Sequence, residues 1–127
     1  MTERLLQFIW QMQYFNKTDL HTVSGDRLAI SYPGQFNTNQ GPDFLEAVIS
    51  IANTKWAGNI ELHVKASDWK VHRHDDDQNY GNIILHVVWE HDEDIYDAKG
   101  KTIPALSLND RVPKVLLQRY EELIYTQ

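Results

Sequence analysis

The chain has 127 residues, a formal net charge of −6 and no cysteine. Disulfides and thiolate metal sites are therefore excluded, and the net charge argues against a broad basic surface for duplex nucleic acid. No run approaches the roughly 18 apolar residues of a membrane span, and no signal-peptide pattern opens the chain. We expect a cytoplasmic protein without membrane contact. Residues 1–127 should form one domain, either whole or the N-terminal part of a longer protein.

Helical spacing is found at both ends of the chain. Residues 3–15 carry apolar side chains at i, i+4 and i+7, and Thr2 can cap the start. Residues 113–125 carry a second apolar face, with Asn109 or Asp110 as the expected cap. This closing helix is either purely structural or a surface for contact with a missing C-terminal region.

Strand-like runs fill the middle of the chain. They cover residues 28–32, 44–51, 55–64, 83–89 and 103–108, while 33–42 has the composition of a loop. Residues 44–51 and 55–64 read as a hairpin with a bulge at Gly58. The nearly continuous apolar run 83–89 is typical of a central strand, and Pro104 limits the last strand to an edge or a strand start. We therefore predict an α/β fold with a central mixed sheet of four to five strands and a helix at each end of the sequence.

The second hairpin arm alternates cleanly. Ile60, Leu62 and Val64 should face one side, packed under the helices, because side chains in a strand alternate with a period of two. The opposite side then carries a carboxylate, an imidazole and an ammonium, from Glu61, His63 and Lys65.

The predicted hairpin carries two carboxylates, one at the entry of its first arm and one in the middle of its second arm. Asp43 at its entry and Glu61 in its second strand can converge on a hard cation such as Mg²⁺ or Mn²⁺, which prefers oxygen ligands. The alternative is that Asp43 forms an Asx-type turn while Glu61 pairs with Lys65 or Arg73.

Histidines supply a second group of candidate ligands. His72 and His74, followed by three aspartates, can bind Zn²⁺ or Mn²⁺, or can belong to a solvated loop. His86 lies inside an apolar strand, where a histidine is more often a satisfied core residue than a ligand. Proximity to His63 or His74 would change that interpretation.

Four sequence blocks resemble the bacterial domain of unknown function 2851 family: NQGPDFLEAVI, WAGNIELHVKASDW, HRHDDDQNY and NIILHVVWEHD. The similarity runs from the N-terminal helix to at least Asp92. The family name implies no function.

A second, distant resemblance is to the PD-(D/E)xK nuclease-like superfamily, whose fold is that of restriction endonucleases. Pro42-Asp43 matches its first motif position and Glu61-Leu62-His63 its second, with His63 where lysine is usual and Lys65 one step further on the same face. The resemblance implies a metal-dependent phosphodiesterase acting on nucleic acid. Asp43 and Glu61 would bind Mg²⁺ or Mn²⁺ in preference to Zn²⁺, with His63 and His74 as further candidate ligands. His63 would orient or deprotonate water, and Lys65 would offset phosphate charge. The alternative is a non-catalytic interaction or scaffold domain.

Overall fold

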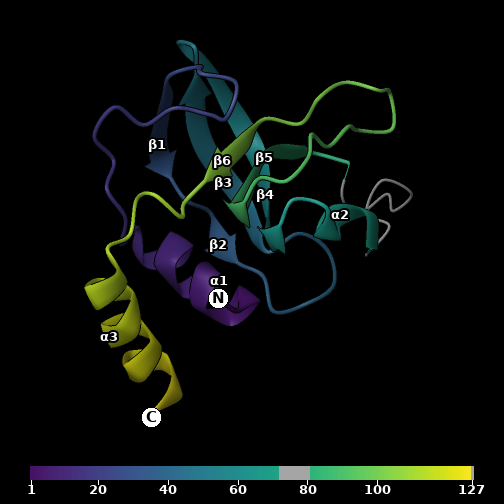
Figure 1. Ribbon diagram of the computed structural model, residues 1–127. Helices are drawn as coiled ribbons and strands as arrows, with labels where there is room; N and C mark the ends of the chain where they lie inside the picture. The colour runs from purple at the N-terminus through teal and green to yellow at the C-terminus, as the bar shows by residue number, and fades with distance from the viewer. Residues whose placement is uncertain (72–80, 127) are drawn as a thin grey trace.

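The computed structural model describes residues 1–71 and 81–126 (Figure 1). Its elements, in chain order, are α1 (Glu3–Met12), β1 (Leu28–Tyr32), β2 (Gln35–Phe36), β3 (Phe44–Ile51), β4 (Thr54–Lys65), α2 (Asp68–Val71), β5 (Ile83–Glu90), β6 (Ala105–Ser107) and α3 (Lys114–Tyr125). The predicted mixed α/β architecture, with a helix at each end of the sequence, is confirmed. No helix within the described residues is long and apolar enough to cross a bilayer.

The sheet has the order β1-β3-β4-β5-β6, with β2 paired to the start of β3. The pairs β1–β3 and β3–β4 are antiparallel, whereas β4–β5 and β5–β6 are parallel. Residues 84–88 of β5 are all buried. The prediction of a central strand beside β4 is therefore confirmed, and β6 lies at the edge of the sheet, as Pro104 suggested.

Two local predictions were wrong. The expected loop 33–42 contains β2, whose Phe36 ring lies 5.4 Å from the Phe44 ring, because pairing with β3 orders a segment too short to show alternation. The bulge lies not at Gly58 but on the facing strand, where the register shifts between Phe44 and Ala47 and Glu46 has a φ of 58°. Gly58 is needed for another reason: a Cβ there would lie 2.5 Å from Ile84 Cγ2.

The two terminal helices lie side by side (Figure 1), and Arg4 Nη2 donates to the Ile124 carbonyl oxygen at 3.0 Å. Thr2 caps α1 as predicted, since its Oγ1 accepts from the Leu5 N–H at 3.2 Å. The cap predicted for α3 was wrong. Pro113 occupies the N-cap position without a side-chain hydrogen bond, because Asn109 and Asp110 lie in the turn before it.

Each face of the sheet has its own buried cluster. The larger cluster packs α1 against β3, β4 and β5; among its members are Ile9, Trp10, Phe44, Ile60, Leu62 and Leu85. The smaller cluster covers the opposite face and consists of Ala66, Trp69, Val88, Ile95 and Ile103. Because both faces are covered, the polar side chains of Glu61 and His63 in β4 are also enclosed.

Candidate functional site

Two carboxyl groups meet where β3 begins. Phe44 is in register with Ile60 in the antiparallel β3–β4 pair, so the preceding residue, Asp43, lies beside Glu61. Asp43 is fixed from two elements: its Oδ1 accepts from Gln7 Nε2 of α1 at 2.8 Å, and its Oδ2 accepts from the Leu62 N–H at 2.8 Å. The two carboxyl groups are therefore assembled by strand pairing and oriented by a helix.

The carboxyl group of Glu61 is neutral in this environment. Burial raises the pKa of Glu61 from 4.5 to about 11, assisted by the side-chain hydrogen bond to Asp43 and by the negative charge of Asp43. The Glu61 side chain is 3% exposed, so water cannot offset these effects. At neutral pH, protonated Glu61 donates to the Asp43 carboxylate, and the pair carries one proton and one negative charge.

A pair of histidines lies next to these carboxyl groups. In the parallel β4–β5 pair, Glu61 is in register with His86. His86 Nε2 lies 2.8 Å from His63 Nδ1, and the two side chains are 0% and 1% exposed. One of these nitrogens donates its proton to the other. A zinc ion bound by both nitrogens would hold them about 3.3 Å apart, so 2.8 Å is the separation of a hydrogen bond.

Trp69 of α2 covers the imidazole pair. Its ring centroid lies 5.1 Å from that of His86 and 6.2 Å from that of His63. Hydrogen bonds hold the start of α2: the Lys65 N–H donates to Asp68 Oδ2 at 3.2 Å, and Ser67 donates to Asp92 through its N–H and its hydroxyl.

The predicted alternation of β4 is confirmed, but its polar side is not a solvent-facing surface. Ile60 and Leu62 belong to the larger cluster, while Glu61 and His63 are enclosed on the other side. Val64 is half-buried rather than packed in the core. The period of two identifies which residues share a face; the cover of that face comes from α2 and from the loop before β6.

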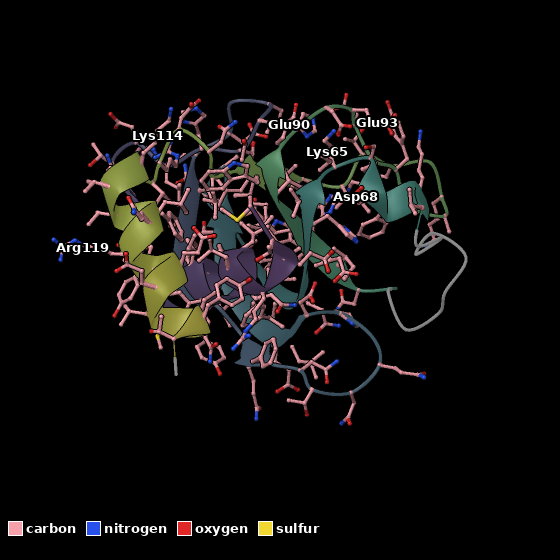
Figure 2. The ribbon with its side chains drawn as sticks, turned by 60° about the horizontal axis from the view of Figure 1, so that its bottom comes forward. Lys65, Asp68, Glu90, Glu93, Lys114 and Arg119 are labelled. Atoms are coloured by element: carbon pink, nitrogen blue, oxygen red, sulfur yellow. The ribbon has the colours of Figure 1, made fainter. Side chains whose placement is uncertain are left out.

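Lys65 does not join the carboxyl pair. It lies four residues beyond Glu61, or about 13 Å along the strand, and its side chain is exposed. Figure 2 shows it together with Asp68, Glu90 and Glu93 at one edge of the molecule. The pKa of Asp92 lies below its usual value. Burial alone would raise this pKa, but the hydrogen bonds from Ser67 and the charge of Lys65 lower it by more.

Asp43, Glu61 and His63 are therefore brought together, and His86 and Gln7 join them. The proximity to His63 on which the interpretation of His86 depended is observed. His86 gave only the weak signal of a polar residue in an apolar strand, and its role depends on the β4–β5 register. Gln7 gave no signal at all. His72, Arg73 and His74 lie outside the described residues.

The carboxyl pair offers two oxygen ligands to a hard cation, which would take the place of the Glu61 proton. Within residues 1–71 and 81–126, no group of three or more histidine, aspartate or glutamate side chains is arranged to hold a metal ion. The remaining ligands at this site would have to be water or substrate oxygens, an arrangement that Mg²⁺ commonly adopts.

Together, the fold and the site define a mixed α/β protein in which a buried carboxyl pair adjoins a buried imidazole pair. Residues 3–127 match the family described as "Protein of unknown function (DUF2851)", and the chain belongs to this family. The family resemblance seen in the sequence blocks is thereby confirmed. Comparisons with curated proteins and with solved structures give no match.

Proposed function

We propose that the protein is a divalent-cation-dependent hydrolase of phosphodiesters in nucleic acid. The observation that carries this proposal is the Asp43–Glu61 pair, in which two strands bring carboxyl groups together at the positions of the PD-(D/E)xK-like motif. Two adjacent carboxyl groups that hold a single proton can exchange that proton for a cation with little rearrangement.

Each residue of the proposed site has a separate role. Gln7 and the Leu62 N–H orient Asp43, so that Asp43 and Glu61 together present oxygens to Mg²⁺ or Mn²⁺. A two-oxygen set suits these cations better than Zn²⁺. When bound, such a cation would supply Lewis-acid activation of a phosphoryl oxygen and of water. His63 would accept a proton from the attacking water, with its ring held in place by His86.

Lys65 has a different role from a lysine at the reacting phosphate. At about 13 Å along β4 from Glu61, its ammonium is in position to contact another phosphate of a polymeric substrate. This placement favours an oligonucleotide over a mononucleotide as substrate. The cytoplasmic location that we propose is consistent with the absence of cysteine.

A non-catalytic interaction or scaffold domain is the second candidate. It is favoured by the neutral Glu61, whose proton satisfies the carboxyl pair without any cation. The net charge of −6 also opposes extended contact with nucleic acid. In this alternative, the carboxyl pair only joins α1, β3 and β4.

Calorimetric titration with Mg²⁺ and Mn²⁺ separates the two candidates. The wild type should bind with a Kd of about 1 mM or tighter, and binding should release about one proton, measured in buffers of different ionisation enthalpy. Asp43→Asn and Glu61→Gln should weaken binding at least about tenfold. Glu90→Gln, which removes an exposed carboxylate from the end of β5, should bind like the wild type.

Cleavage of single- and double-stranded DNA and RNA should then require the cation and be lost in the same two variants. A wild type that binds neither cation at millimolar concentration and cleaves none of these substrates would overturn the hydrolase proposal and favour the scaffold alternative.

A further inference from the structure

A cavity of about 430 Å³ opens at the far end of β4 from the carboxyl pair. It arises from the sheet register. Because β5 begins opposite Asn59, residues 54–57 of β4 pair with β3 on one side and, within the described residues, with no strand on the other. The segment 97–104 passes on that open side and leaves a hollow between itself and the strand.

One wall of the cavity is an indole ring. Trp56 is 44% exposed, although it lies within a strand, and its ring contributes to the cavity lining. The ammonium of Lys101 lies over one face of the indole ring, 5.9 Å from its centroid, so a ligand that stacks on that face would displace or share the ammonium. An aromatic side chain left half-exposed beside a cavity is typical of a ligand-binding wall.

The floor and the rim of the cavity differ in chemistry. The floor is apolar, with Ile51, Ile84 and Ile103. The rim is polar and combines carboxylate, amide and hydroxyl groups, from Asp26, Asp97, Asn82 and Thr54. Two rim carboxylates outweigh one ammonium, so the cavity disfavours phosphates and other anions.

Two local features keep this rim in place, a side-chain carboxylate that accepts from backbone N–H groups and a glycine. Asp97 Oδ1 accepts from the N–H groups of Lys99 and Lys101, both at 2.9 Å, which holds the turn that carries Lys101. Gly58 allows Asn82 to lie close to β4: a Cβ at position 58 would lie 2.9 Å from the Asn82 backbone carbonyl oxygen and 3.1 Å from the Asn82 side-chain nitrogen, Nδ2. The indole and the polar rim are thus held facing one hollow.

We propose that this cavity binds a neutral saccharide. A pyranose ring has an apolar C–H face, which stacks on the Trp56 indole, and an equatorial ring of hydroxyls, which donate to Asp26 and Asp97 and bond to the Asn82 amide. The site is separate from the proposed hydrolase site, because Trp56 and Glu61 lie about 16 Å apart along β4.

Ligand-observed saturation-transfer NMR tests the proposal with glucose, galactose, N-acetylglucosamine and their β-1,4-linked dimers. At least one should bind saturably with a Kd of about 1 mM or tighter. Trp56→Ala should weaken that binding at least about tenfold, and Asp26→Asn should weaken it measurably. The matched control is Tyr32→Ala, which removes an aromatic side chain of similar exposure, 46%, from β1 and should bind like the wild type.

Urea unfolding of each variant shows whether the fold is retained. Three results would overturn the proposal: no saccharide of this panel binds, binding survives Trp56→Ala, or adenosine or cytidine displaces the sugar at lower concentration. The last result would reassign the cavity to nucleobases, with the Trp56 ring stacking on a base.

Discussion

Replacing Glu61 by glutamine should change how the stability of the fold depends on pH. The pKa of Glu61 is about 11 in the folded chain, against an ordinary value of 4.5, with burial as the main cause. Between these two pH values the folded chain holds a proton that the unfolded chain has released. The free energy of unfolding should therefore fall by about 1.4 kcal/mol for each pH unit of increase. The contribution of Glu61 is complete below pH 4.5 and is lost progressively as the pH rises toward 11.

Glutamine at position 61 keeps the shape and a donor N–H toward Asp43 but cannot release a proton. From pH 6 to pH 8, Glu61→Gln should gain about 2.7 kcal/mol of stability relative to the wild type. Urea unfolding followed by tryptophan fluorescence at pH 6, 7 and 8 measures this difference. Using the difference between two proteins cancels the other titrating groups that they share. Glu90→Gln is the control, because Glu90 is exposed and its replacement should leave the pH dependence unchanged.

The reasoning is refuted if the stability difference between Glu61→Gln and the wild type is the same at all three pH values. Glu61 would then be ionised in the folded chain, and the carboxyl pair would carry two negative charges and need a cation or a nearby positive group. A stability difference that shrinks as the pH rises would also contradict the prediction, which requires the difference to grow.

Two further predictions concern the core and the imidazole pair. Leu85 is fully buried in the larger cluster, so Leu85→Ala should cost roughly 2–5 kcal/mol in urea unfolding; a loss under about 0.5 kcal/mol would contradict the packing of β5. His63→Ala should abolish cleavage while leaving cation affinity intact, whereas loss of cation binding in calorimetry would make His63 a ligand.

Much of the sheet could be predicted because its signals are local. Alternation along β4 placed Leu62 and Glu61 on opposite faces, and the nearly continuous apolar run of β5 identified a strand buried on both sides. Thr2 could be recognised as a cap from its position before an apolar helix. Each of these inferences needs only residues within a few positions of one another.

The rest depends on contacts between distant segments. Periodicity could not show that Trp69 would cover the polar face of β4, since that depends on where α2 folds back. The proximity of His63 and His86 follows from the register of two parallel strands 23 residues apart, which no local pattern encodes. Gln7 reaches Asp43 across 36 residues because α1 packs against the sheet, which no local pattern encodes either.

The enclosed carboxyl pair links stability and function in a way that one double variant can test. Burying ionisable groups is unfavourable for folding, and replacing such groups with neutral partners of the same shape is often neutral or stabilising. Asp43→Asn combined with Glu61→Gln removes the charge. The new asparagine oxygen can accept from the Leu62 N–H, and its NH2 group can donate to Gln7 once the Gln7 amide turns to present its oxygen. If the pair only joins α1, β3 and β4, this variant should keep the wild-type fold, lose the pH dependence that Glu61 confers, and equal or exceed the wild-type stability at pH 8. If the pair is the cation site, the same gain in stability should come with complete loss of Mg²⁺ binding and cleavage. A variant that unfolds would contradict both, because the three elements would then depend on the carboxylate that accepts from Gln7 and from the Leu62 N–H.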